Sequence, residues 1–231
     1  GFDTWHEPLS AAAKNLSGDK LQAFKEKLGT TVHRDFKRLL ASEKRAVIET
    51  RNDYIGGTGK ELMSDERVVT FRMMRGQLVI DFDITFIASY GDVEIGDMKD
   101  AGLSVRIPSS MSLKSEMGGK IVNSEGVRDG DTWSKRAAWV DYHGPVDGEH
   151  LGIAILNHPD SFRYPTPWHV RTYGLFTANP FGFKSLDETL EDASFTLIDG
   201  TRFLLRHRLV FHEGDEKDAK IAQAFKAYSK Q

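Results

Sequence analysis

A histidine, an arginine and a tyrosine alternate in the run from Trp168 to Tyr173. At the two-residue period of a strand, His169, Arg171 and Tyr173 share one face. Burying these groups unpaired would cost several kcal/mol, so the face meets solvent or lines a polar cavity. With Asn179 nearby, the set offers donors, acceptors and a proton-exchanging imidazole. It can bind a hydroxylated or carboxylated ligand; the alternative is a solvent-facing sheet with cross-strand pairs.

A tryptophan and a carboxylate share a second strand face, in the run Trp139-Val140-Asp141-Tyr142. Trp139 and Asp141 lie two positions apart, on the same side of the predicted strand. A carboxylate beside an aromatic ring suits sugar binding and general acid–base work. The alternative is that Asp141 caps a turn at the strand end.

Two basic residues border a Gly-bounded loop that runs from Gly96 to Gly102. Lys99 lies in the loop, and Arg106 lies near the end of the strand that follows. Both could contact an anionic or polyhydroxyl ligand, and the alternative is that solvent or neighbouring charges satisfy them.

The remaining histidines do not form a zinc-helix pattern. No pair has the His-x-x-x-His spacing, although His158 and Asp160 could form a metal pair on a loop. His207 is expected to be a hydrogen-bonded core residue, because it shares a strand face with apolar side chains. His212 lies at the end of that strand beside Glu213, and we expect it to be exposed.

The composition excludes several classes of protein. The net charge is -3, so a general basic surface for nucleic acid is not indicated. No apolar run reaches the roughly 18 residues that a membrane span needs. There is no cysteine, which excludes disulfides, zinc–thiolate sites and cysteine nucleophiles without assigning a compartment. Walker loops, dinucleotide fingerprints and nucleophile elbows are also absent.

Short strands dominate the predicted elements and favour a large antiparallel sandwich formed by residues 1–231 as one domain. In the run 78–88, apolar and polar residues alternate, as in a strand with one face packed on a core. The run 151–157 is apolar on both faces, as in a central strand. Hairpin turns are predicted at Arg75-Gly76 and Asp199-Gly200. Helical patterns occupy 9–28 and 215–231.

The order of several motifs resembles a bacterial domain family labelled PmoA-like, or methane oxygenase-like, and otherwise of unknown function. The resemblance covers roughly residues 30–211. Its most specific parts are the Pro-Trp-His-Val-Arg and Asn-Pro-Phe motifs. The full series is Asp65-Glu66-Arg67, Asp81-Phe82-Asp83, Gly96 to Lys99 through Arg106, Trp139 to Gly144, His158-Pro159, Pro165 to Gly174, and Ala178 to Phe181.

The resemblance implies an all-β fold, mainly antiparallel, with the general plan of galactose mutarotase-like sandwiches. It also implies that the family's N-terminal part is missing, that 9–28 is a helical insertion, and that His33 matches a family histidine. Oxygenase chemistry is not expected, because a membrane oxygenase subunit needs spanning helices and a copper or iron site needs clustered ligands.

We therefore expect an enzyme that acts on a sugar or modified glycoside by acid–base chemistry in a concave sheet pocket, without a metal or other cofactor. The base would be Asp141 or Glu66, and the acid or proton shuttle His158 or His169. Epimerisation, elimination and hydrolysis all fit such residues. The expected ligand contacts are His33, Lys99, Arg106, Trp139, Trp168, Arg171, Tyr173 and Asn179.

The alternative is a non-catalytic carbohydrate-binding or accessory module, which would need the aromatic and polar face but no acid or base. A purely structural interaction domain is favoured if Trp139 and Trp168 both belong to the core. The residues indicate no oligomeric state and no partner beyond a small carbohydrate.

Overall fold

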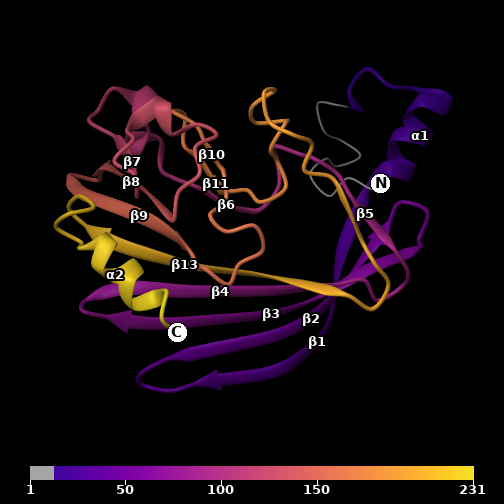
Figure 1. Cartoon of the computed structure of the whole chain (residues 1–231), viewed down its shortest axis with the longest axis horizontal. Coiled ribbons are helices and arrows are strands. Elements are labelled where there is room, and N and C mark those ends of the chain that lie inside the picture. The colour runs from indigo at the N-terminus through magenta and orange to yellow at the C-terminus, as the bar shows by residue number, and fades with distance from the viewer. Residues whose placement is uncertain (1–12) are drawn as a thin grey trace.

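One large antiparallel sheet organises the chain (Figure 1). The computed structural model describes residues 13–231. Eight strands pair in the order β1-β2-β3-β4-β13-β9-β8-β7, and each pairing is antiparallel. These strands are β1 (Gly29–Ala41), β2 (Ala46–Gly56), β3 (Glu61–Met74), β4 (Gln77–Ile87), β7 (Lys120–Asn123), β8 (Trp139–Val146), β9 (Glu149–Asn157) and β13 (Arg202–Glu213).

Two small sheets form a second layer over one face of the large sheet (Figure 1). One has the order β10-β11-β6 and the other the order β12-β5. Their strands are β5 (Val93–Ile95), β6 (Leu103–Arg106), β10 (Trp168–Val170), β11 (Leu175–Ala178) and β12 (Phe195–Leu197). The sandwich plan predicted from the sequence is therefore confirmed.

The helices are few and lie outside the sheets. The α-helices are α1 (Gly18–Lys27) and α2 (Ile221–Tyr228), and the short 3-10 turns are η2 (Ser109–Met111), η3 (Leu113–Ser115) and η4 (Asp129–Thr132). The N-terminal helical prediction over 9–28 is met from Gly18 onward, and its first part falls on residues outside the described range. Within residues 13–231, no helix is long and apolar enough to cross a membrane.

The face of the large sheet toward the small sheets, here called the inner face, holds the main apolar core. Tyr142, Ile155 and Leu209 from the large sheet pack in one cluster with Trp168 and Phe176 from the small one. Strand periodicity explains the division, because Tyr142 alternates with residues that point the other way. A second inner cluster lies under β5 and β12.

The opposite face, here called the outer face, is covered by α2. Val79 of β4 and Val210 of β13 pack there with Ile221 and Tyr228 of the helix. β13 is covered on both faces, with Leu209 in the inner cluster and Val210 in the outer one. The central position expected for 151–157 agrees with β9, which lies between β13 and β8.

Of the two predicted hairpin turns, one is confirmed and one differs from the structure. Arg75-Gly76 makes the predicted β3–β4 hairpin, with positive φ at both positions. Asp199-Gly200 makes a turn, but the flanking strands do not pair: β12 pairs with β5, whereas β13 pairs with β4 and β9. The backbone amide of Gly200 instead donates to Ala88, so the turn joins two layers.

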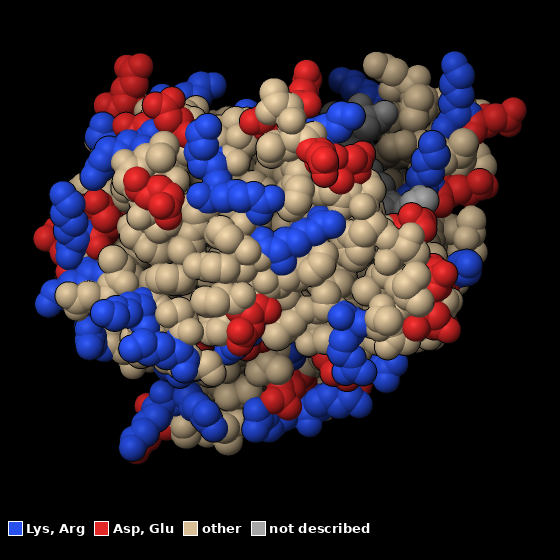
Figure 2. Space-filling model, viewed as in Figure 1, with Lys and Arg blue, Asp and Glu red and all other residues tan. Residues whose placement is uncertain are grey.

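Charges of both signs are interspersed on the visible surface (Figure 2), as the near-balanced composition predicts.

The outer face also buries charge. The Arg208 guanidinium donates to Asp81 from Nε at 2.5 Å and from Nη2 at 3.0 Å, and lies over the ring of Tyr228. Arg72 pairs with the same carboxylate. These two ion pairs to Asp81 link β3, β4 and β13 beneath α2.

We predict that Asp81→Ala lowers the free energy of unfolding by about 3–5 kcal/mol, because it leaves the buried Arg208 charge without its partner. The control is Asp35→Ala, which breaks an exposed pair with Lys37 and should cost at most about 1 kcal/mol. Urea unfolding of both variants measures the difference. Equal losses would contradict the assignment.

Candidate functional site

Three adjacent strands bring two histidines to one carboxylate on the outer face. His143 of β8 pairs in register with Gly152 of β9, and Gly152 pairs with His212 of β13. Asp141 lies two residues before His143, so both side chains leave β8 on the same side. The two imidazoles therefore flank the position of Gly152 and reach Asp141 from opposite directions.

Gly152 is required by this arrangement. A Cβ atom there would lie 2.2 Å from Cε1 and 2.5 Å from Nε2 of His212, and 3.0 Å from Cβ of His143. Such distances are shorter than van der Waals contact, so any side chain would displace the His212 ring. The glycine is thus a packing requirement of the two histidines rather than a turn signal.

The carboxylate of Asp141 uses both of its oxygens. Oδ1 lies 2.6 Å from Nδ1 of His143, and Oδ2 lies 2.6 Å from Nε2 of His212. All three side chains are buried, and Asp141 is fully so. Burial alone would lower the pKa of His212, but the hydrogen bond and negative charge of Asp141 outweigh it and raise the pKa above its usual value.

A second carboxylate reaches this group from the segment before α2. One ligand atom each of Asp141, His143 and Glu216 lies within 4.8 Å of the other two. Glu216 is buried and accepts a hydrogen bond from Nη2 of Arg128 at 3.2 Å. Asp141, His143 and Glu216 together are called the Asp141 cluster below, and His212 is hydrogen-bonded to it.

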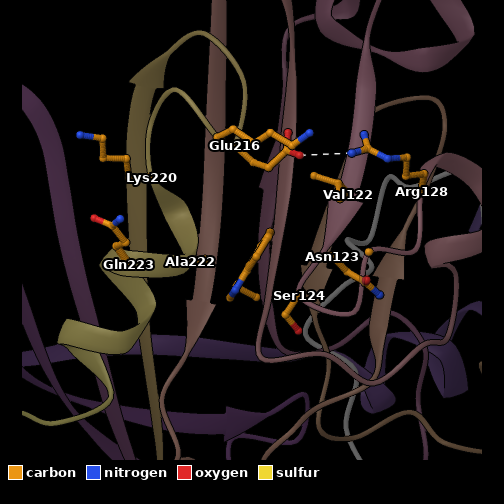
Figure 3. A pocket seen from close by; sticks show the side chains of 11 residues that line it. Val122, Asn123, Ser124, Arg128, Glu216, Lys220, Ala222 and Gln223 are labelled. Carbon is orange, nitrogen blue, oxygen red and sulfur yellow. Dashed lines mark hydrogen bonds and ion pairs between the residues drawn. The ribbon is translucent and has the colours of Figure 1, made fainter.

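A cavity of about 410 Å³ adjoins the cluster at Glu216. Figure 3 shows Glu216 joined to Arg128, with Lys220 and Gln223 of the helical segment on the opposite side of the view from Asn123 and Ser124. Trp139 also lines the cavity. The indole, the amides and the charged groups come from β7, β8 and the loop-to-helix segment at α2, so the docking of that segment forms the wall.

The Asp141 cluster could hold a cation, since it offers one imidazole and two carboxylates. It could also exchange a proton with a molecule in the cavity, because its carboxylates lie beside imidazoles and Glu216 lines that space.

The His169 group lies elsewhere, in the second layer. Nδ1 of His169 donates to the Lys99 carbonyl at 2.6 Å, and Nε2 accepts from Nε of Arg171 at 3.1 Å. The amide of Asn179 donates to the same carbonyl at 2.8 Å, and the Arg171 guanidinium lies over the ring of Trp133. Burial, followed by the charge of Arg171, lowers the pKa of His169 although the bond to Lys99 opposes this. These bonds hold the loop around Lys99 against β10.

Tyr173 does not share the face of His169, contrary to the predicted strand over Trp168 to Tyr173. β10 ends at Val170, and a turn closed by the bond from the Gly174 amide to Arg171 follows. Gly174 has a φ of +99°, which a strand does not use. Tyr173 is therefore exposed, with the Arg106 guanidinium 5.6 Å from its ring centre.

Trp168 belongs to the core, and a ring-stacking role for it is ruled out by that position. It is fully buried in the inner cluster, and its indole N–H donates to the Ala137 carbonyl at 3.0 Å. Trp139 also belongs to a core cluster, the one beneath α2, and is 7% exposed; its exposed part borders a cavity. Both tryptophans are therefore core residues, which is the condition under which a structural interaction domain is favoured.

The other three predicted residues are dispersed. His158 is buried on the outer face against the ring of Tyr228, and burial together with the Arg206 charge lowers its pKa. Glu66 is exposed on β3, which lies four strands from β8 in the sheet order. His33 is exposed on β1, with Nδ1 3.3 Å from Oδ1 of Asn52.

A separate buried carboxylate was not singled out as a site from the sequence. Asp65 accepts hydrogen bonds from Nδ2 of Asn52 and the hydroxyl of Tyr54, both at 2.7 Å, and forms an ion pair with Arg67. Burial, then the Asp65 charge, raises the pKa of Tyr54. These bonds saturate Asp65 and tie β2 to β3.

The structure thus places the twelve predicted site residues in separate places rather than in one pocket. Asp141 and Trp139 lie at the cavity region, and His169, Arg171, Asn179 and the backbone of Lys99 form the loop contact. His212, expected to be exposed, is buried, because the segment after β13 folds back over it. His143 carried a usable signal, since it follows Asp141 at strand period; Glu216, in a turn before a helix, carried none.

The family of the chain is shown by a match over residues 1–226 to a model described as Family of unknown function (DUF6807). The chain belongs to this family. None of the curated proteins matches it. Membership names no reaction, so the chemistry has to be argued from the site.

We predict that Gly152→Ala lowers the free energy of unfolding by about 1–3 kcal/mol, because the new methyl group must push His212 away from Asp141. Gly96→Ala is the control, since a Cβ there meets nothing within 4 Å. Its effect should stay within about 0.5 kcal/mol in the same urea titration. If the two substitutions cost the same, Gly152 is not a packing requirement.

A second prediction concerns pH. Because the folded-state pKa of His212 is raised, its contribution is fully present below its ordinary value of 6.5 and is lost as pH rises through the raised value. The stability difference between wild type and His212→Gln should therefore shrink as the pH rises above 6.5. Urea unfolding at several pH values tests this, and the variant cancels the contributions of the other histidines. A difference that stays constant, or grows, contradicts it.

Proposed function

We propose that this chain is a carbohydrate-active enzyme whose sugar binds in the cavity beside Trp139 and whose acid–base centre is the Asp141 cluster. The observation that carries the proposal is the contact between the two: Glu216 belongs to the cluster and also lines the cavity. A binding space and a set of proton-exchanging groups therefore share a wall.

The cavity suits a small polyhydroxylated ligand. Its volume of about 410 Å³ falls within the roughly 300–1,000 Å³ of small-molecule sites. Trp139 lines it, and the 7% of this residue that remains exposed is an aromatic surface that a sugar ring could touch. Gln223 offers an amide that both donates and accepts, as hydroxyl groups require, and Arg128 and Lys220 would attract a carboxylate or phosphate substituent.

Glu216 is the group that would exchange a proton with the ligand, since it is the carboxylate of the cluster that lines the cavity. Arg128 holds one of its oxygens at 3.2 Å. Asp141, with an imidazole on each oxygen, lies behind it and would position His143 and stabilise positive charge on His212. The groups support proton transfer at a sugar carbon or a glycosidic oxygen, so epimerisation, elimination and hydrolysis remain the reaction classes.

The substrate is first identified with a panel of monosaccharides, uronic acids and methyl glycosides, using NMR to detect product and calorimetry to detect binding. We predict that Glu216→Gln lowers kcat on that substrate by about 10²–10⁴-fold, because the amide cannot exchange the proton. Gln223→Ala should raise KM with a smaller effect on kcat, since it removes a wall contact rather than the acid or base.

Glu66→Gln is the matched comparison, because Glu66 is the other carboxylate that the sequence offered as a base and it lies exposed and four strands away. Loss of turnover in Glu66→Gln but not in Glu216→Gln contradicts the proposed centre. Sugar binding weakened by Gln223→Ala, without turnover of any panel member, assigns a binding module instead. No binding and no turnover across the panel contradicts the proposal altogether.

A further inference from the structure

The Asp141 cluster has a composition that proton exchange does not require. It combines one imidazole and two carboxylates, from residues 75 positions apart in the chain, with their ligand atoms mutually within 4.8 Å. Asp141, His143 and Glu216 are all buried. Two carboxylates this close to each other in a buried site repel unless positive charge lies between or beside them.

We propose that Asp141, His143 and Glu216 bind a divalent transition-metal ion, with Zn²⁺ as the best match and Mn²⁺ next. One nitrogen and two oxygen donors suit these borderline ions, whereas Ca²⁺ and Mg²⁺ prefer oxygen alone. The ion would displace the proton between Asp141 Oδ1 and His143 Nδ1, and these two atoms would have to move apart from their present 2.6 Å to accept metal bonds of about 2.0–2.2 Å. Three protein ligands leave a position for water, as catalytic zinc sites do.

The surrounding residues act as an outer shell for these ligands. His212 Nε2 lies 2.6 Å from the second oxygen of Asp141, which fixes the carboxylate and leaves Oδ1 directed at His143. Arg128 holds Oε1 of Glu216, so the other oxygen is free to turn toward the site. Such hydrogen bonds to the ligands are a regular feature of protein metal sites and orient the donor atoms.

Access and strain also fit an ion. Glu216 lines the cavity of about 410 Å³, so an ion could enter from there and its open position would face the cavity. Asp141 and His143 lie on one rigid strand in the middle of paired neighbours, whereas Glu216 comes from the segment between β13 and α2. Two ligands therefore come from a fixed strand and one from an adjustable segment. Small rotations of the side chains would let the site close around an ion, with metal–ligand bonds of about 2.0–2.2 Å.

The alternative is a purely structural role, in which a hydrogen-bonded cluster holds the segment after β13 against the sheet. It accounts for the bond between Asp141 and His143, and for the bond between Asp141 and His212. It also satisfies Glu216 through Arg128, whose side chain is half exposed, but it gives no reason for a Glu216 oxygen to lie within 4.8 Å of both Asp141 and His143. A cation held by the three groups would supply that reason.

The test is a calorimetric titration of the chelator-treated whole chain with Zn²⁺, followed by metal analysis after dialysis. We expect one tightly bound Zn²⁺ per chain, and an affinity lowered at least about tenfold in Glu216→Gln and His143→Gln. Co²⁺ should give visible absorption bands in the wild type that are weakened or absent in both variants. Zn²⁺ should raise the melting temperature of the wild type and not that of Glu216→Gln, because an ion that binds the folded state stabilises it.

His158→Gln is the matched control, since His158 and Asp160 form another histidine–carboxylate pair, at 3.6 Å, outside the cluster. It should leave Zn²⁺ affinity unchanged. If His143→Gln does not fold, Glu216→Gln decides, because its substitution lies in a connecting segment and keeps the shape of the side chain. No stoichiometric Zn²⁺ or Mn²⁺ binding, or binding that Glu216→Gln leaves intact, overturns the proposal.

This metal site stands independently of the sugar chemistry, and the outcomes separate the two. Stoichiometric Zn²⁺ binding without turnover of any sugar would support the ion and count against the enzyme. Sugar turnover by the chelator-treated chain at the full rate would support the enzyme and count against a role for the ion. If both hold, the ion held by Asp141, His143 and Glu216 would supply Lewis-acid chemistry at the wall of the cavity.

Discussion

The burial of the Asp141 carboxylate is the constraint on which the site depends. A charge removed from water costs several kcal/mol unless partners replace the lost hydration, and here each oxygen meets an imidazole at 2.6 Å. Those imidazoles can approach only because Gly152 leaves the space between them empty. The polar cluster thus requires a glycine at position 152 of β9, the strand between β8 and β13. Residues on three neighbouring strands therefore depend on one another.

The two layers of the fold divide the polar groups by purpose. In the second layer, His169 and Asn179 donate hydrogen bonds to the carbonyl of Lys99, and Arg171 donates to His169. These hydrogen bonds hold a loop in place. On the outer face, Glu216 keeps contact with a cavity. Buried polar side chains alone do not distinguish structure from function; the distinguishing feature is an open space beside groups that are not all saturated by neighbouring backbone.

Strand alternation made much of the fold predictable from the sequence. The face that Trp139 and Asp141 share, the β3–β4 hairpin and the interior position of β9 all follow from a two-residue period and turn residues. The pairing of β13 with β9 and β4 did not follow, since it joins segments some 50 and 120 positions apart. No local pattern specifies which strands meet at such separations.

The site was less predictable than the fold for the same reason. Asp141 and Trp139 could be selected as a carboxylate next to an aromatic ring, but the sequence could not show that His212 would meet Asp141 across β9. His212 at a strand end has the local features of an exposed residue, and only the return of the chain over it creates the burial. Conversely, the alternation over His169, Arg171 and Tyr173 suggested a binding face, and the turn at Gly174 divides that set.

The docking of α2 connects stability to the site. Ile221 and Tyr228 pack on the outer face, and the segment that precedes them carries Glu216 to Asp141. That segment is ordered by the Asp215 carboxylate, which accepts hydrogen bonds from the backbone amides of Lys217 and Asp218. The position of the Glu216 carboxylate is therefore set by apolar burial several residues away, whereas Asp141 and His143 are set by strand pairing. A site assembled from one rigid strand and one helix-anchored segment can close on a ligand or an ion without any rearrangement of the sheet.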